Sequence, residues 1–326
     1  MKTILLVVGP ALGDVGRSLV IARAVLESTP NVRVVFAHIV PGHGDRLLRP
    51  EFYSIRIRYR TKGDQRFSDR LELTMRTVDP ALIYLYLSPV PWLYLVRFPE
   101  IPRAYITNFF LTSLVPTETF QVRHLNNNFK EWNHRRLGRD LPELRDAKTL
   151  YDSDAVLLCD PVELVSSAVT MANPYHLVGP CVWQPRGSLP SPLRKKSRIL
   201  LVSLGSTGSR RFPDEMVGKL RHTLDCDLSV WVTGRESARK SQKHGPIYSA
   251  VPLRPILQRS ALGITQGGTG STYAALLQGV PVAIWPSHRN HEILGELLTG
   301  AGVGAFVTEL ENLGPARAAE ILLSMI

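Results

Sequence analysis

The chain has 326 residues, about twice the length of a typical domain, so we expect two domains. Hydrophobic residues make up 44% of the chain and charged residues 21%, which excludes a disordered or fibrous protein. The net charge of +11 favours an anionic partner without identifying it. The three cysteines, Cys159, Cys181 and Cys226, lack the spacing of a disulfide framework or metal site, so we predict a reducing, cytoplasmic location.

The first predicted element is a buried strand over residues 3–8. Lys2 and this apolar run could be mistaken for a signal peptide. However, the run is short and leads into a glycine turn without a small-residue cleavage site. No apolar stretch of the sequence reaches the roughly 20 residues that cross a bilayer, so we predict no transmembrane helix.

Strand-like runs and helical patterns alternate through the rest of the first half. The predicted helices cover residues 18–26 and about 120–136, and the predicted strands cover 32–38, 81–87, 103–107 and, as the last of this half, 155–159. This alternation is typical of a parallel sheet with helices packed on its faces.

Residues 55–60 alternate apolar side chains with arginines, as a half-exposed strand does. The arginine face could attract an anionic acceptor or an acidic lipid. A solvated sheet edge, protected by its charges against aggregation, is the more common explanation for such a pattern.

The pattern changes at residues 185–198, which are rich in proline and basic residues and which we interpret as a linker. Strands at 199–204 and 228–232 then enclose a glycine-rich turn and a helix over about 213–224. We therefore predict an α/β fold with two Rossmann-like doubly wound domains, residues 1–184 and 199–326, that face each other across a cleft.

Three glycines at the end of a predicted strand form the most informative motif. Apolar residues 262–265 lead into Gln266, which is followed by the sequence GGTG and a helix that opens at Ser271. Backbone N–H groups at such a helix N-terminus can approach a diphosphate without obstruction by side chains. A plain tight turn needs glycines too, so the motif alone does not decide between the two.

A longer pattern surrounds this motif. Val251-Pro252, the glycine motif, Gly279-Val280-Pro281 and Gly302-Val303-Gly304 follow one another over roughly fifty residues. In order and spacing they resemble the donor-binding region of nucleotide-sugar-dependent glycosyltransferases related to the UDP-glycosyltransferases. The turn at 13–19 and the segments 136–142, 178–180 and 202–206 are similar to other landmarks of that superfamily.

The resemblance implies the GT-B architecture, with an N-terminal acceptor-binding domain and a C-terminal donor-binding domain. It implies that the donor site contains Ser206, Thr207, Val251, Gln266, Gly268, Thr269, Gly270, Ser271, Asn290 and His291. Gly13 and His124 would contact the acceptor, and Asp14 would be the catalytic base. We predict no cofactor besides the nucleotide sugar as co-substrate. No histidine or cysteine cluster of the sequence has metal-ligand spacing, so we predict no bound metal.

Four positions depart from the superfamily. Asp14 stands where a histidine usually acts as base, and a carboxylate with a pKa of about 3.9 is a weak base unless burial raises it. The alternative is that Asp14 caps the first helix. Gln266 replaces a histidine, Ala274 replaces a ribose-binding glutamate, and Asn290 with His291 replaces an acid–amide pair. These changes indicate either an altered donor or acceptor, which we favour, or a scaffold without turnover.

We therefore predict inverting, metal-independent transfer of a sugar from a UDP- or dTDP-linked donor to a small-molecule or lipid acceptor. A catalytically degenerate auxiliary protein and a nucleotide-sugar hydrolase or epimerase are the alternatives. Nucleic acid is not expected as a partner, because no recognition helix, aromatic sheet motif or zinc module occurs. Residues 91–98 are apolar and aromatic enough for peripheral membrane contact, although burial is the more common fate. The oligomeric state is left open.

Overall fold

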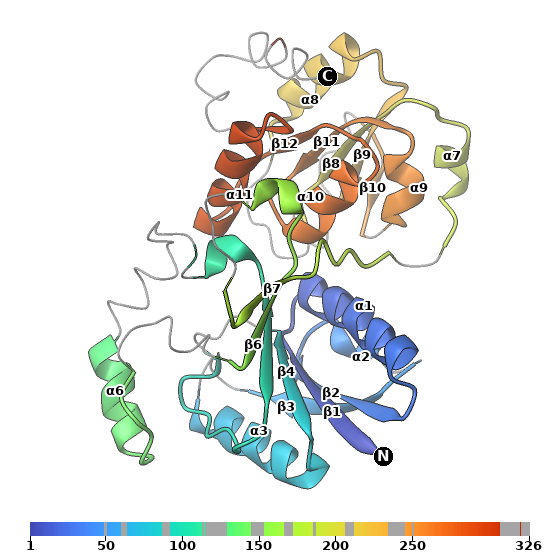
Figure 1. Cartoon of the computed structure of the whole chain (residues 1–326). Coiled ribbons are helices and arrows are strands. Elements are labelled where there is room, and N and C mark those ends of the chain that lie inside the picture. Colours follow the sequence, from blue (N-terminus) through green and yellow to red (C-terminus); the bar gives the residue numbers. More distant parts are fainter. Residues whose placement is uncertain are drawn as a thin grey trace. The chain divides into compact units, whose positions relative to one another are not determined.

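The computed structural model describes residues 1–48, 51–59, 64–86, 92–112, 114, 129–144, 153–165, 172–184, 187–205, 212–233, 245–249, 251–306 and 320. The chain divides into two compact units, Met1–Cys181 and Val182–Ile326, which we call unit 1 and unit 2. Figure 1 labels the elements of both units.

Unit 1 contains a seven-stranded sheet in which the strands pair in parallel, in the order β3-β2-β1-β4-β5-β6-β7. The strands are β1 (Lys2–Val8), β2 (Val32–Val40), β3 (Tyr53–Arg58), β4 (Leu82–Tyr86), β5 (Arg103–Thr107), β6 (Ala155–Leu158) and β7 (Tyr175–Leu177). The central strand β1 is buried from Ile4 to Val8, as expected for a strand covered on both faces.

Helices cover both faces of this sheet. The helix α1 (Leu12–Ser28) joins β1 to β2, and α3 (Gln65–Val78) joins β3 to β4 in the opposite direction along the sheet. Because such crossovers are right-handed, the two helices lie on opposite faces, as Figure 1 shows. The other helices in the described part of unit 1 are α2 (Gly44–Leu47), η1 (Phe109–Leu111), α6 (Phe129–Leu137) and η3 (Val162–Leu164).

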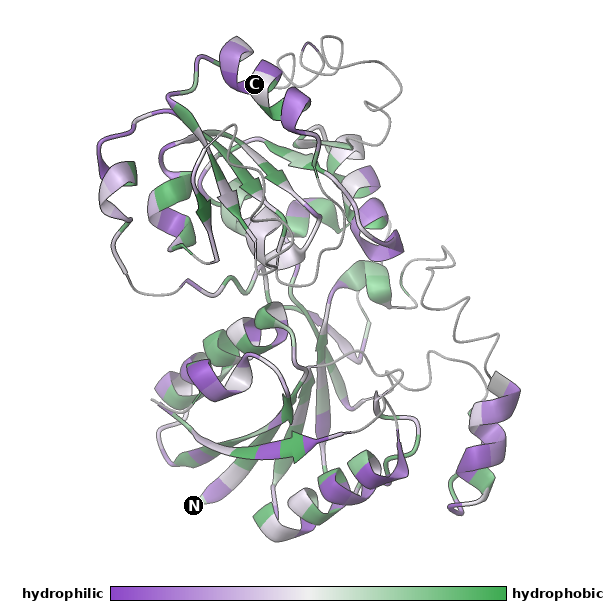
Figure 2. Ribbon diagram, turned by 180° about the vertical axis from the view of Figure 1, so that it is seen from behind, coloured by the Kyte–Doolittle hydropathy of each residue, from purple (hydrophilic) through white to green (hydrophobic). Residues whose placement is uncertain are grey.

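Unit 2 contains a six-stranded sheet, also paired in parallel, in the order β10-β9-β8-β11-β12-β13. Its strands are β8 (Ile199–Ser203), β9 (Leu228–Val232), β10 (Ile247–Tyr248), β11 (Ser260–Thr265), β12 (Val282–Ile284) and β13 (Gly304–Phe306). Its helices are α7 (Ser191–Arg194), α8 (Asp214–Thr223), α9 (Leu253–Leu257), α10 (Thr269–Leu276) and α11 (Arg289–Gly300). The strands form an apolar centre, green in Figure 2, where Phe212 packs edge-on against Trp285 with ring centroids 5.1 Å apart.

The doubly wound α/β fold class that we predicted is confirmed in both units. Two details of the prediction were wrong. The strand at 155–159 does not close the first half, because the short strand β7 pairs with β6. The helix α1 begins six residues before the predicted start, since Gly13 and Gly16 weaken the helical signal of its first turn.

Two segments that the sequence left open have a defined environment. In the predicted linker, Leu193 of α7 is fully buried, so this segment packs into unit 2. The apolar residues 92–96 are also buried, with side chains at most 4% exposed, which agrees with burial rather than with membrane contact. None of the described helices combines the length and hydropathy needed to cross a bilayer.

The edge strand β3 carries the predicted arginine face. Arg56 and Arg58 are exposed and Ile57 is buried, which confirms the half-exposed alternation. The side chain of Arg56 is held by Asp45, at 2.5 Å. The pattern therefore fits a charged sheet edge.

Candidate functional site

The strand order of unit 2 reverses between β8 and β11. The chain adds β9 and β10 on one side of β8, and β12 and β13 on the far side of β11. At such a switch point the loops after the two central strands run in opposite directions, which opens a ligand site at the carboxyl edge of the sheet. Gly205 follows β8 and Gln266 follows β11, so the predicted donor motif lies at this edge.

The side chain of Gln266, after β11, reaches toward Gly205, after β8. A Cβ atom on Gly205, whose φ is +65°, would lie 3.4 Å from Oε1 of Gln266. Gln266 is only 3% exposed, and among the described residues its Nε2 has no hydrogen-bond partner. A buried donor without a partner costs about 1–3 kcal/mol. The position therefore favours an acceptor group of a ligand next to this amide.

The turn after Gln266 needs its glycines. Gly267 has a φ of +87°, and a Cβ there would lie 2.8 Å from Cβ of His291, so only glycine fits. Gly268 is the N-cap of α10, and no described side chain caps this helix end. The first N–H groups of a helix lack intrahelical acceptors, and these include the amides of Gly270 and Ser271. The turn can thus donate main-chain hydrogen bonds to an anion.

Two buried threonines hold this turn in place between β11 and α10. Oγ1 of Thr265 at the end of β11 and Oγ1 of Thr272 in α10 are 2.9 Å apart, and both side chains are buried. The backbone N–H of Gly267 also donates to Oγ1 of Thr265, at 3.2 Å. These contacts hold the glycine turn and the start of α10 in one arrangement, which is the preorganisation that an anion site requires.

The predicted sugar-binding pair begins α11. His291 is buried against Gly267, and burial, together with the neighbouring His288, lowers its pKa to about 3. The imidazole is therefore neutral at physiological pH. Nδ1 of the ring lies 3.1 Å from the hydroxyl oxygen of Ser287 and 3.5 Å from the backbone nitrogen of Ser287, so both polar groups of this residue face the imidazole. Within the described part of the chain, Oδ1 of Asn290 is buried without a partner.

The remaining predicted donor residues differ in what the structure says of them. Ser206 and Thr207 lie outside the described residues. Val251 is buried before α9, so a ligand would meet its main chain. Ala274 is fully buried in α10, so the position that matches the superfamily's ribose-binding glutamate is part of the core. The donor roles themselves stay predictions.

Unit 1 has its own switch point, between β1 and β4. The chain adds β2 and β3 on one side and β5 to β7 on the other. Asp14 lies here, in the first turn of α1, and its Oδ2 accepts a hydrogen bond from the backbone N–H of Ala11, at 3.3 Å. Gly13 precedes it and is exposed, while His124 lies outside the described residues. Asp14 therefore does cap α1, and the cap leaves its second oxygen available.

Burial raises the pKa of Asp14 from 3.8 to about 7, against the opposing effects of the Ala11 N–H and the positive charge of Arg17. A base is most effective when its pKa lies near the working pH. With its raised pKa, the Asp14 carboxylate is therefore a stronger base than an ordinary aspartate.

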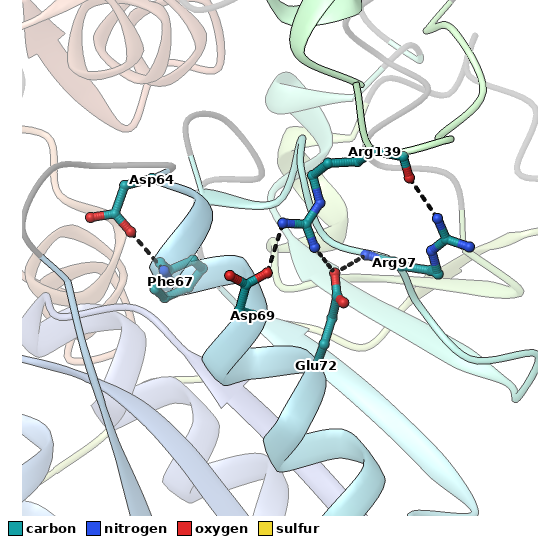
Figure 3. Close-up of polar contacts among 6 residues, drawn as sticks. All are labelled: Asp64, Phe67, Asp69, Glu72, Arg97 and Arg139. Carbon is teal, nitrogen blue, oxygen red and sulfur yellow. Dashed lines mark hydrogen bonds and ion pairs between the residues drawn. The ribbon is translucent and has the colours of Figure 1, made fainter. Parts of the chain in front are cut away.

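Segment 136–142, which also resembles the glycosyltransferase superfamily, is held to α3 by ion pairs (Figure 3). The guanidinium of Arg139 binds Asp69 at 2.7 Å and Glu72 at 2.8 Å. Glu72 also accepts the backbone N–H of Arg97, whose side chain donates to the carbonyl of Arg139. This landmark has a structural role in unit 1.

Part of the chain is similar in sequence to named glycosyltransferases. No protein-family model matches the chain. A PGL/p-HBAD biosynthesis glycosyltransferase of Mycobacterium tuberculosis is 32% identical over 197 residues, covering 58% of this chain and 44% of that protein. A PGL/p-HBAD biosynthesis rhamnosyltransferase of Mycobacterium bovis is 25% identical over 198 residues, covering 60% of this chain and 43% of that protein. The chain thus spans less than half the length of these curated relatives.

Solved structures match the whole chain. A glycotransferase of kitacinnamycin has a TM-score of 0.77 and 18% identity, and the match covers 99% of this chain and 90% of that one. The chain has the fold of the GT-B glycosyltransferases. A spinosyn rhamnosyltransferase complexed with spinosyn aglycone has a TM-score of 0.65 and 14% identity, covering 100% of this chain and 91% of that one. The predicted resemblance to glycosyltransferases is confirmed.

Sequence reasoning missed three residues beside Asp14. Arg17, Asn108 and Asp160 are buried polar residues at the carboxyl edge of the unit 1 sheet. Only Arg17 left a signal, as a charge on the face of α1 that otherwise carries apolar and small residues. Asn108 and Asp160 follow β5 and β6, and nothing in a single sequence distinguishes them from ordinary loop residues.

Proposed function

We propose that this protein transfers a sugar from a nucleoside diphosphate donor, UDP- or dTDP-linked, to the hydroxyl group of a small-molecule or lipid acceptor. The observation that carries the proposal is the buried Nε2 of Gln266, which has no partner among the described residues, beside the N-terminus of α10, which no described side chain caps, at the switch point of unit 2. The glycosyltransferase and rhamnosyltransferase names of the relatives support the same reaction class.

In this proposal the diphosphate lies against the glycine turn. The amides of Gly270 and Ser271 and the amide of Gln266 donate hydrogen bonds to its oxygens, and the dipole of α10 favours its negative charge. The same groups stabilise the charge that grows on the leaving diphosphate, which makes a metal ion unnecessary. Asn290 and the neutral His291 orient the sugar hydroxyls through hydrogen bonds.

The acceptor reacts at Asp14. As the acceptor oxygen forms its bond to the anomeric carbon, its proton passes to the Asp14 carboxylate. The bond from the anomeric carbon to the diphosphate oxygen breaks, and its electron pair leaves with the diphosphate. Attack opposite the leaving group inverts the anomeric configuration. Because the pKa of Asp14 is about 7, about half of the carboxylate is ionised at pH 7 and roughly nine-tenths at pH 8.

Ligand-dependent thermal stability tests the donor site. UDP, dTDP, GDP and their sugars, including a rhamnose donor, are added singly, and a ligand at 100 times its Kd adds about 2.7 kcal/mol of stability. We expect the uridine or thymidine nucleotides to stabilise the protein. A response to GDP alone, or to none of these, would contradict the proposal.

A matched pair of variants tests the role of Gln266. Gln266→Met keeps the side-chain volume but removes the amide donor, and Gln278→Met makes the same change beyond the other end of α10. A hydrogen bond to a charged group contributes about 1.5–3 kcal/mol, so Gln266→Met is expected to weaken nucleotide binding by about 10- to 100-fold. Equal affinities of the two folded variants would remove Gln266 from the site.

Turnover separates the alternatives. Release of diphosphate that requires an acceptor supports transfer, and equal release without any acceptor indicates a hydrolase. Nucleotide binding with no release of diphosphate across a broad panel of small-molecule and lipid acceptors indicates an auxiliary protein. Asp14→Asn is expected to abolish transfer and to keep donor affinity, and transfer at the wild-type rate in this variant would exclude Asp14 as the base.

A further inference from the structure

A buried arginine lies one helical turn after Asp14. Arg17 is 4% exposed, and its Nη1 donates to Oδ1 of Asn108, at 3.1 Å. Its guanidinium carbon is 5.1 Å from the ring centroid of Tyr86, the last residue of β4. Residues three apart on a helix share a face, so Arg17 and Asp14 both project toward the carboxyl edge of the sheet.

A relay of hydrogen bonds links Arg17 to a buried carboxylate. Nδ2 of Asn108 donates to Oδ1 of Asp160, at 2.7 Å, and the backbone N–H of Phe109 donates to Oδ2 of Asp160, also at 2.7 Å. Asp160 is fully buried and Asn108 is 4% exposed. The chain Arg17–Asn108–Asp160 therefore joins α1 to the ends of β5 and β6 by hydrogen bonds.

Stability alone is a poor reason for such a network. Taking charges out of water costs several kcal/mol per ion, and apolar residues of similar volume often stabilise a core as well or better. Arg17, one member of this network, also lies one helical turn from Asp14, a carboxyl group whose pKa burial raises to about 7. The positive charge of Arg17 favours the ionised form of the Asp14 carboxylate.

We propose that Arg17 is a positioning residue, which fixes the first turn of α1 against β4 and β5 and sets how readily Asp14 takes the proton of the acceptor. This inference rests on the proposed role of Asp14 as base. Asp160 is linked to Arg17 through Asn108 and carries the opposite charge. Arg17 therefore lowers the proton affinity of Asp14, whereas Asp160 raises it.

Other titratable groups face this network. Burial raises the pKa of Tyr86, so its phenol stays neutral. Cys159 and Cys181 share a hydrogen bond, which raises the pKa of the Cys159 thiol and lowers that of Cys181. Cys181 is thus the group whose titration could be confused with that of Asp14, and Cys181→Ala is the control for it.

The test follows the Asp14 carboxyl directly. Carbon-13 NMR of the aspartate side chains gives the titration midpoint, and Asp14→Asn identifies the signal. We expect Arg17→Met to raise the midpoint by about one pH unit, and Arg17→Lys to restore most of it, because an opposite charge nearby favours the carboxylate. Arg23→Met removes an exposed arginine of the same helix, paired with Glu51, and is expected to leave the midpoint unchanged.

Asp160→Asn is expected to shift the Asp14 midpoint in the direction opposite to Arg17→Met. It keeps the shape of the side chain and removes the negative charge, so the Asp14 midpoint is expected to fall. This variant also tests the inference if Arg17→Met does not fold. The acidic limb of the pH profile of kcat/KM should move with the NMR midpoint in each variant, and Cys181→Ala should leave that limb in place.

The outcomes separate the two proposals. An Asp14 midpoint that is the same in wild-type protein, folded Arg17→Met and Asp160→Asn would overturn the role of Arg17, even in an active enzyme. An absence of transfer with every donor and acceptor would overturn the proposed function, while the NMR titration still decides whether Arg17 and Asp14 are coupled.

Discussion

Substituting Gly267 by alanine tests how tightly the donor turn is built. The φ of Gly267 is +87°, and an alanine Cβ would lie 2.8 Å from Cβ of His291 and 3.0 Å from its Cα and its carbonyl oxygen. Two of these three atoms belong to the backbone of α11, so the helix itself must move. We therefore expect both lower stability and a displaced start of α11.

Gly279 supplies the control for this experiment. It lies just beyond the other end of α10 with a φ of +67°, and a Cβ there would meet nothing within 4 Å. Gly279→Ala therefore suffers only the backbone strain of about 1–2 kcal/mol. Gly267→Ala suffers similar strain and, in addition, an overpacking cost of about 1–3 kcal/mol. The difference between the two variants isolates the contact with His291.

Urea unfolding, followed by the fluorescence of Trp285 and the other tryptophans, measures the stability of both variants, and calorimetry measures their nucleotide affinity. We expect Gly267→Ala to be less stable than Gly279→Ala by about 1–3 kcal/mol, and to bind nucleotide more weakly. Equal stability and equal affinity would refute the close packing of α11 on the turn, and with it the placing of Asn290 and His291 in the donor site.

Three further predictions concern stability. The pKa of Asp14 is higher in the folded protein than in the unfolded chain, so the folded protein binds the carboxyl proton more tightly. The free energy of unfolding therefore falls as the pH rises from about 4 to about 7, by at most about 1.4 kcal/mol per pH unit. Urea unfolding across this range should show a smaller fall in Asp14→Asn, and parallel curves would contradict the raised pKa. Thr272→Val removes the buried contact with Thr265 and should lower the free energy of unfolding by about 1–2 kcal/mol, whereas an unchanged urea midpoint would show the hydroxyl pair to be dispensable. Arg139→Met leaves Glu72 without its half-buried partner and should destabilise unit 1 by about 1–2 kcal/mol without changing nucleotide affinity, and a change in affinity would contradict a purely structural role.

The fold was predictable from the sequence because buried parallel strands consist of continuous runs of apolar residues. The predicted strands at 103–107 and 228–232 coincide with β5 and β9. Short edge strands such as β7 and β10 have only three and two residues, and no periodicity can be read from so few. The position of the glycine turn between β11 and α10 was also predictable, because its glycines lie close together in the sequence.

The surroundings of Asp14 were not predictable, because they depend on residues far apart in the chain. Asn108 lies 91 residues after Arg17, and Asp160 a further 52 residues on. Their meeting requires β5 and β6 to be placed in order beside β4, which is a property of the whole sheet. The burial that raises the pKa of Asp14 likewise comes from packing, to which the residue type gives no guide.

The replacement of histidine by aspartate at the first turn looked, from the sequence, like a loss of basic strength. In the structure burial brings the pKa of Asp14 to about 7, close to the 6.5 of an unperturbed imidazole, so proton affinity is conserved while the charge is changed. A histidine would become a cation on taking the proton, whereas Asp14 becomes neutral. A buried position favours the neutral product, since burial penalises charge. In the proposed mechanism, the burial that destabilises the ionised carboxylate before reaction therefore assists the proton transfer, and the proposed role of Arg17 is to keep enough of the carboxylate ionised for the transfer to begin.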